Sequence, residues 1–235
     1  MIFAMSDIHG YSKDKTMSLL QQAGFDKNDF MYVLGDVIDR GEDGIKMLQW
    51  MMEQPNVELI LGNHEAMFLS CGFIFDEITD EFLTGLTEKK MSLLRTWQFN
   101  GAAPTIKALS CLTSPERNDI LDYICEAPLF DTVTVNERDF LLTHSGLGHF
   151  DPNKKMSDYT PDELLWNRPR LGTEYFDDIT VIFGHTPTFK YGEEYKGRIL
   201  KTKTWIDIDA GAANGYAPAL LCLDTMEEFY IHTNE

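Results

Sequence analysis

The sequence predicts an α/β fold, and two observations lead to that prediction. Short apolar runs recur along the chain, and each ends in a glycine or a polar residue, which is the pattern of buried strands. Segments with helical spacing separate the first three runs, so the chain begins as β-α-β-α-β. In such sheets the reactive groups collect in loops beyond the carboxyl ends of the strands, so the residues after each run are the candidates for function.

The expected elements follow in chain order. Strands are expected at residues 2–5, 31–34, 57–61, 140–142 and 181–183, with helices at 15–22 and 45–52. The segment 65–129 is richer in helical patterns, including 88–98 and 116–125, and is divided by Pro104, Pro115 and Pro128. A hairpin is expected around the polar turn 136–138, and later strands at 205–208, 220–223 and 229–231. No repeat or linker divides the chain, so residues 1–235 are expected to form a single domain.

The charge balance limits the classes of partner. The chain has 38 acidic and 20 basic residues, for a formal net charge of -18. This acidic envelope repels phosphate backbones and disfavours a nucleic-acid-coating role, although some carboxylates could bind cations. No stretch approaches the ~18 apolar residues of a membrane span, and the N-terminus shows no secretory pattern, so a cytoplasmic location without membrane contact is expected. The four cysteines lack C-x-x-C spacing and are expected to be reduced and mostly buried.

Carboxylates and imidazoles follow the expected strands at short spacings. Asp7 and His9 are two residues apart, so at a strand end both side chains can point the same way. The loop Gly35-Asp36-Val37-Ile38-Asp39-Arg40-Gly41 places two carboxylates and an arginine between glycines that permit a tight turn. Further polar side chains after apolar runs are those of Asn63, His64, His144 and His185.

These residues form a mixed oxygen and nitrogen donor set. The candidate metal ligands are Asp7, His9, Asp36, Asn63, His144 and His185. Such a set suits manganese, iron or zinc better than calcium or a thiolate-loving ion. It is too large for one tetrahedral site, whereas two ions ~3.5–4 Å apart and bridged by one carboxylate would use all of it. The sequence therefore predicts two divalent metal ions, manganese first, with iron or zinc as alternatives.

The order of the motifs resembles that of a known family. The series D-x-H-G, G-D-x-x-D-R-G, G-N-H-E, H-S-G and G-H-T-P, from Asp7 to about Gly211, is similar to the calcineurin-like metallophosphoesterases. The intact D-R-G and N-H-E motifs resemble its phosphoprotein phosphatase branch, especially the short bacterial and bacteriophage members. The resemblance implies the metallophosphoesterase fold, in which two mixed β-sheets pack as a sandwich with flanking helices.

The resemblance also implies how the metals would be held. One ion would be bound by Asp7, His9 and Asp36, and the other by Asp36, Asn63, His144 and His185. Asp36 would then bridge the two ions. A hydroxide that bridges the same ions would attack the phosphorus atom directly, without a covalent phosphoenzyme.

Further roles concern the substrate. The resemblance implies that Arg40 and Arg168 bind the phosphate, since a guanidinium fork matches phosphate oxygens bidentately, with Asn63 and His64 beside them. His64 would be the general acid, oriented by Asp39. Arg168, in the run Leu-Trp-Asn-Arg, is preferred over Arg170 as the second arginine.

Other features are expected to be structural. Residues 97–101 resemble another family element, but Ala102 stands where a second glycine is common, which leaves the chemistry untouched. The residues expected to support loops or packing are His149, Asp207, Asp209 and His232.

The expected activity is hydrolysis of a phosphate monoester, in the first place as a protein serine/threonine phosphatase acting on a phosphorylated protein or a small phosphorylated substrate. A symmetrical dinucleoside polyphosphate hydrolase is the alternative, because it shares the same motifs. A non-catalytic binding module of this fold is a further class, although no expected ligand is missing. Substrate choice is expected to lie in the segments 66–130 and 147–180.

Overall fold

The computed structural model describes residues 1–231, with the side chain of Glu81 excepted, so His232 lies outside the described part. Two five-stranded sheets form its centre. The first sheet has the order β10 (Glu228–Tyr230), β9 (Ala219–Cys222), β1 (Ile2–Met5), β2 (Phe30–Val33) and β3 (Val57–Leu59). The second has the order β4 (Phe130–Val135), β5 (Arg138–Thr143), β6 (Ile179–Phe183), β8 (Trp205–Asp207) and β7 (Leu200–Lys201).

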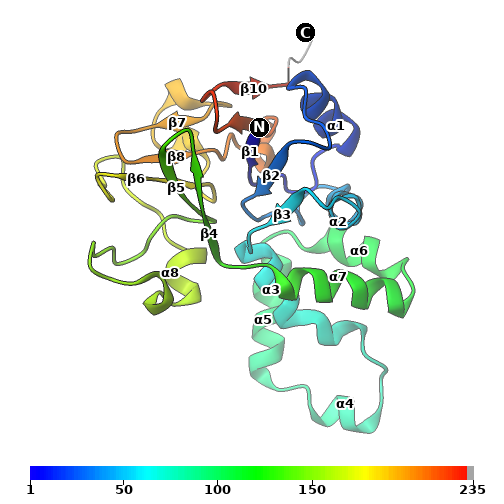
Figure 1. The fold of residues 1–235 in the computed structure, drawn as a ribbon. Helices are drawn as coiled ribbons and strands as arrows, with labels where there is room; N and C mark the ends of the chain where they lie inside the picture. Colours follow the sequence, from blue (N-terminus) through cyan, green and yellow to red (C-terminus); the bar gives the residue numbers. More distant parts are fainter. Residues whose placement is uncertain (232–235) are drawn as a thin grey trace.

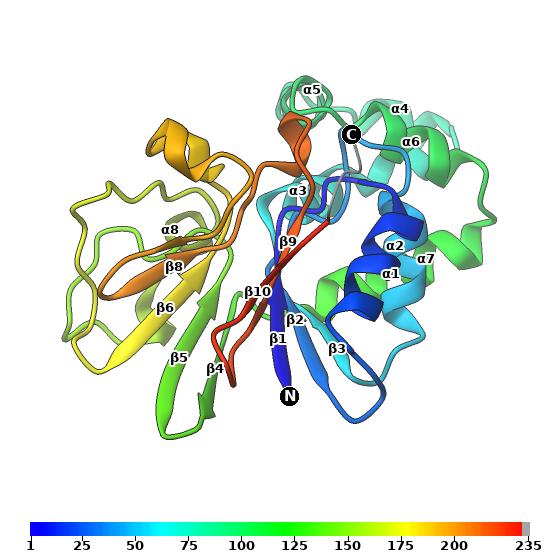
Figure 2. The same ribbon diagram turned by 90° about the horizontal axis from the view of Figure 1, so that it is seen from above.

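Both sheets are mixed. Strands β1, β2 and β3 run parallel, as do β5, β6 and β8, and antiparallel strands complete each sheet. The two sheets face each other, with helices outside them (Figures 1 and 2). Successive residues of a strand point to opposite faces. Accordingly, Ala4 packs in the cluster between the sheets, while Phe3 and Met5 pack against the helices. The predicted α/β sandwich is therefore confirmed.

Helices α1 (Lys13–Gln22) and α2 (Gly44–Met52) lie against the outer face of the first sheet (Figure 2). Helices α6 (Ala103–Ser110) and α7 (Ser114–Glu126) contact α2, and α3 (Asn63–Cys71) contacts α5 (Glu88–Phe99) and α7. Helix α4 (Asp80–Thr84) lies away from the sheet (Figure 1). Thr87 caps α5, and Thr113 forms a capping box with Glu116 at the start of α7. Pro104 and Pro115 lie in the first turns of α6 and α7, where the missing N–H costs nothing.

The structure differs from the sequence prediction in a few elements. The hairpin turn has two residues, Asn136 and Glu137, both with positive φ, and Arg138 already pairs with Val135. Strand β7 and the short helix α8 (Pro161–Leu165) were not expected, whereas α4 and α6 lie in the segment 65–129, for which helical patterns were expected without individual bounds. The cysteines are free as predicted, but Cys111 and Cys125 are exposed, contrary to the expectation of mostly buried thiols.

No helix in residues 1–231 combines the length and the apolar character needed to cross a membrane.

Candidate metal centre and active site

The predicted ligands meet at the carboxyl ends of the central strands of both sheets. Asp7 and His9 follow β1, and Asp36 follows β2. These three residues have φ values of 49°, 45° and 55°, in the left-handed region that non-glycine residues rarely adopt. Such backbone strain persists only where the surroundings fix it, and it is concentrated at functional sites.

The two glycine motifs explain how these loops come together. A Cβ on Gly41 would lie 2.2 Å from the carbonyl oxygen of Gly10, so neither loop tolerates a side chain at the crossing. Backbone hydrogen bonds then join the loops, including His9 N–H to the Asp36 carbonyl at 2.9 Å. Gly10 of D-x-H-G and Gly41 of D-R-G therefore allow the two loops to come into direct backbone contact.

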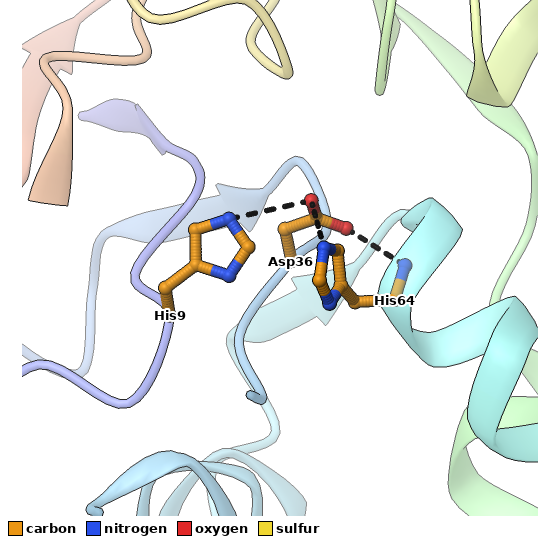
Figure 3. Close-up of side chains that lie close together, drawn as sticks. All are labelled: His9, Asp36 and His64. Carbon is orange, nitrogen blue, oxygen red and sulfur yellow. Dashed lines mark hydrogen bonds and ion pairs between the residues drawn. The ribbon is translucent and has the colours of Figure 1, made fainter. Parts of the chain in front are cut away.

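One group of side chains forms around His9. Its Nε2 lies 3.5 Å from Asp36 Oδ2 and 3.7 Å from Asp7 Oδ1. Its Nδ1 faces the Ile38 carbonyl oxygen at 3.1 Å, which directs the Nε2 lone pair to the carboxylates. Figure 3 shows Asp36 between the rings of His9 and His64.

A second group forms around His144, which follows β5. Its Nε2 lies 2.8 Å from Asn63 Oδ1, 3.2 Å from His185 Nδ1 and 3.4 Å from Asp36 Oδ1. Its Nδ1 lies 2.8 Å from the Leu34 carbonyl oxygen. Asp36 thus contributes one carboxylate oxygen to each group.

The donor set fits divalent cations. Burial lowers the pKa of His144 to about 3, so its imidazole is neutral and can donate only one hydrogen bond. With Nδ1–H donated to the Leu34 carbonyl, the Nε2 lone pair faces the acceptor oxygens of Asn63 and Asp36. Facing lone pairs repel one another unless a cation lies between them, so the arrangement suits a metal ion.

The shifted pKa values of the buried side chains also favour bound cations. Burial raises the pKa of Asp7 and Asp36 well above the usual range, with repulsion from Asp209 and Asp7, respectively, as the next cause. Burial also lowers the pKa of His9 and of His185. The Nε2 atom of His185 is buried without a partner in the described chain. Crowded carboxylates and neutral imidazoles form an environment that bound cations would stabilise.

A buried pair lies beside the two groups. His64, in the first turn of α3 and not in a loop as expected, has its Nδ1 2.6 Å from Asp39 Oδ2. Asp39 also accepts hydrogen bonds from Trp97 Nε1 at 2.8 Å and Thr105 Oγ1 at 2.6 Å. His64 Nε2, on the other side of the ring, lies 3.2 Å from Arg40 Nη2 and 3.8 Å from Asp36 Oδ2. One nitrogen of His64 also lies within 4.8 Å of the ligand atoms of His9 and Asp36, so distance alone groups it with them.

These residues border a small polar pocket of about 100 Å³. It is lined by His9, Asp36, Arg40, Asn63, His64, Asn100, Trp166, Arg168, His185, Pro187, Lys190, Asp209 and Asn214. Arg168 Nη1 donates to the His185 carbonyl at 3.2 Å and to Thr186 Oγ1 at 3.3 Å. Arg170 is not among the lining residues. The pocket therefore holds two guanidinium groups, from Arg40 and Arg168.

Several residues of the site have no counterpart in the sequence prediction. Glu65 is fully buried, and its carboxylate accepts the backbone N–H groups of residues 36, 37 and 38 at 2.7, 2.9 and 3.2 Å. The sequence feature that could have indicated a role for Glu65 is its place in the G-N-H-E motif. Asn100, Lys190 and Asn214 also line the pocket. Asn100 lies in residues 97–101, which resemble a family element without a chemical role being expected there, whereas no motif or chelating spacing marks Lys190 or Asn214.

The chain belongs to the calcineurin-like phosphoesterase family, whose model matches residues 1–208. It is 23% identical over 188 residues to the symmetrical bis(5'-nucleosyl)-tetraphosphatase of Haemophilus ducreyi, covering 79% of this chain and 58% of the relative. It is 35% identical over 70 residues to the enzyme of that name from Buchnera aphidicola, covering 29% and 26%. The matches thus span less than two thirds of these curated relatives.

Solved structures show the same fold at low identity. A protein assigned as a diadenosine tetraphosphatase has a TM-score of 0.67 at 17% identity, covering all of this chain and 94% of the other. A protein serine/threonine phosphatase from Saccharomyces cerevisiae has a TM-score of 0.56 at 14% identity, covering 100% and 81%. The family is one of phosphoesterases, and the buried imidazoles and carboxylates of this chain form two groups that could hold metal ions.

Proposed function

We propose that the protein is a metal-dependent phosphomonoesterase that removes phosphate from phosphoserine and phosphothreonine in proteins. The observation that carries this proposal is the buried contact between His64 Nδ1 and Asp39 Oδ2 at 2.6 Å. A serine or threonine alkoxide is a poor leaving group and needs a proton, whereas a nucleotide phosphate leaves readily without one. A histidine held in this way by a carboxylate matches the first requirement.

The chain's own residues divide the remaining work. The cations would be held by Asp7, His9, Asp36, Asn63, His144 and His185. When bound, divalent ions such as manganese polarise a phosphoryl oxygen and lower the pKa of water. Arg40 and Arg168 bind the equatorial oxygens of the phosphate, where charge develops. With the phosphate bound by Arg40, a doubly protonated His64, held at Nδ1 by Asp39, would donate its Nε2 proton to the leaving oxygen.

The site continues into a second cavity of about 280 Å³, which supports a substrate larger than free phosphate. This cavity shares Asn63 and Trp166 with the polar pocket and is lined mainly by apolar side chains, among them Met67, Leu93 and Leu165. It lies between α3, α5 and α8. The organic part of a phosphorylated substrate would lie there.

A second candidate is symmetrical hydrolysis of dinucleoside polyphosphates. The specific observation in its favour is that curated relatives carry that name. A purine base could occupy the apolar cavity beside Trp166, so the cavity does not separate the two candidates. The pair of His64 and Asp39 favours the phosphatase on chemical grounds, because a phosphoanhydride has less need of an acid, but its motifs are shared with the dinucleoside polyphosphate hydrolases, so a comparison of substrates decides.

A substrate panel tests the proposal. The protein is stripped of metal with a chelator, supplied with manganese, and offered phosphoserine and phosphothreonine peptides beside diadenosine tetraphosphate and p-nitrophenyl phosphate. Higher kcat/KM on the peptides than on the dinucleotide is expected. Turnover of the dinucleotide but not of the peptides would replace the proposal with the second candidate.

The variant His64→Asn tests the acid directly. It is expected to keep its bound metal and to lose about 10²- to 10⁴-fold in kcat on the phosphopeptides. The loss on p-nitrophenyl phosphate should be much smaller, because nitrophenolate leaves without a proton. Equal losses on both substrates would refute the acid role of His64.

A further inference from the structure

The polar pocket is lined by a third cationic side chain, that of Lys190, besides Arg40 and Arg168. Lys190 ends the short 3-10 helix Thr188–Lys190 after β6, and its exposed side chain lines the same pocket as Arg40 and Arg168. Neither candidate metal group includes it. The G-H-T-P motif ends three residues before Lys190, so the motif itself gives it no role.

Lys190 is one of the seven lysines of residues 1–231 that have no carboxylate partner, whereas six have one. Ion pairs with carboxylates are formed by Lys46, Lys107, Lys154, Lys196, Lys201 and Lys203. Across residues 1–231, Lys190 forms no ion pair, although the chain is strongly acidic. The buried carboxylate of Asp209 lines the same pocket but accepts a hydrogen bond from Gly211 N–H instead.

Like charges gather around this lysine. Burial and the guanidinium of Arg168 lower the pKa of Lys190, with a smaller contribution from Arg40, while Asp209 acts in the opposite direction. Placing an ammonium group near two guanidinium groups is unfavourable unless an anion joins them. One phosphate already has the two arginines and the cations of the metal centre as partners, which leaves Lys190 free for another group.

A neutral donor accompanies the lysine. Asn214 lies in the 3-10 helix Ala212–Asn214 after β8, lines the same pocket and is exposed. In the described part of the chain its side-chain amide makes no hydrogen bond. An ammonium and an amide N–H beside each other are suited to the oxygens of a carboxylate or a phosphate.

We propose that Lys190 and Asn214 form a second anion subsite, which binds an acidic or phosphorylated side chain next to the phosphoserine or phosphothreonine that is hydrolysed. This inference rests on the proposed function and adds a sequence preference to it. The preference is for phosphorylation sites with an acidic neighbour, which the rest of this acidic protein would otherwise repel.

The test uses pairs of phosphopeptides that differ only in a Glu or a Gln next to the phosphoserine, on either side, with the manganese-loaded full chain. Wild type is expected to show a kcat/KM about 3- to 10-fold higher for the Glu peptide of at least one pair, the size of a partly exposed charged contact. The variant Lys190→Gln should reduce this ratio to about one, and Lys190→Glu should reverse it. The control Lys196→Gln, six residues further on and paired with Glu193, should keep the wild-type ratio.

The outcomes separate this inference from the function on which it rests. If both peptides of every pair are hydrolysed equally well by wild type, or if Lys190→Gln keeps the wild-type ratio, the subsite is wrong and the phosphatase stands. If no peptide is hydrolysed but diadenosine tetraphosphate is, both fall, and the charge at Lys190 serves a polyphosphate chain. Because the readout is a ratio within one variant, partial misfolding of a variant does not affect it.

Discussion

The two sheets contribute to the site in different ways. On the first sheet, backbone hydrogen bonds join the loops that follow the strands. Buried Glu65 accepts the N–H groups of residues 36–38, and buried Asp39 contacts His64. On the second sheet, His144 and His185 are buried, but Arg168, Lys190 and Asn214 lie exposed on longer loops. The first half is therefore built to fix geometry, and the second adds side chains that can adapt to a substrate.

The halves meet in the apolar cluster between the sheets, which includes Ala4 and Leu34 from the first sheet and Ile182 from the second. At the site, His185 N–H donates to Asp7 Oδ2 at 2.8 Å, and His144 Nδ1 lies 2.8 Å from the Leu34 carbonyl oxygen. The metal groups span the same boundary, because Asp36 from the first sheet faces His144 from the second. Bound cations would thus add a further link between the two halves at the edge where the site lies.

The largest effect is expected where the two halves share one side chain. In Asp36→Asn the left-handed backbone remains accessible, because asparagine tolerates positive φ, but the shared negative charge is lost. Metal content should fall, and turnover of p-nitrophenyl phosphate should drop by more than the roughly 10- to 100-fold that outer-shell changes cost. Elemental analysis and steady-state kinetics measure both.

The same variant should behave in the opposite way without metal. The metal-free wild type contains repelling buried carboxylates at positions 7 and 36, so Asp36→Asn should melt at a higher temperature than wild type in chelator. Exposed Asp14→Asn on α1 is the control and should match wild type in both assays. An Asp36→Asn protein with the metal content of wild type would contradict the bridging role.

The next prediction weakens only the rigid half. In Glu65→Gln, an amide NH₂ replaces one of the oxygens that accept backbone N–H groups from residues 36–38, which leaves a buried donor unsatisfied. The free energy of unfolding should fall by about 1–3 kcal/mol. The manganese affinity should fall about 10- to 100-fold, because the loop that carries Asp36 loses its support.

Urea unfolding in chelator and manganese titration measure these two effects separately. Glu53→Gln, at the exposed end of α2, is the matched control. If Glu65→Gln unfolds and binds manganese as wild type does, the loop does not depend on this carboxylate, and the contrast between a rigid and an adaptable half loses its main support.

Much of the first half was predictable from the sequence, for a physical reason. Parallel strands end at one edge, so residues placed directly after strands converge whatever the details of the helices. Asp7, His9 and Asp36 follow this rule, and the structure places the carboxylates of Asp7 and Asp36 each within 4 Å of His9 Nε2. The assignment of these residues as metal ligands stays a prediction.

The supporting contacts were not predictable in the same way. Asp39 is held by Trp97 and Thr105, which lie 58 and 66 residues further along the chain, on α5 and at the start of α6. Helix packing creates these contacts. Residues 97–101 resemble a family element, but that resemblance does not pair Trp97 with Asp39, and nothing in the sequence marks Thr105. Lys190 and Asn214 were missed for a related reason, because a single polar residue in a loop normally faces solvent.

The smallest effect is expected in the adaptable half, at the start of α8. Lys154, followed by the Thr160 backbone, lowers the pKa of the Glu163 carboxyl to about 2, against an ordinary value of 4.5. Lys154 Nζ lies 2.7 Å from Glu163 Oε1, and the Thr160 N–H donates to Oε2 at 2.9 Å. Helix α8 in turn supports the second sheet, since the Leu164 carbonyl accepts hydrogen bonds from Ser145.

The lowered pKa of Glu163 determines how its contribution to stability changes with pH. A carboxyl whose pKa is lower in the folded protein stabilises it fully at neutral pH, and this contribution is lost as the pH falls from about 4.5 towards 2. Glu163→Gln should therefore have a slightly lower urea midpoint than wild type at pH 7, and the difference should shrink below pH 4.5. It should stay small throughout, because partly exposed ion pairs contribute little. A difference that is independent of pH would assign the loss to the capping geometry of α8 and not to the charge. Unchanged manganese affinity in this variant would show that the adaptable half can be loosened without loosening the metal centre.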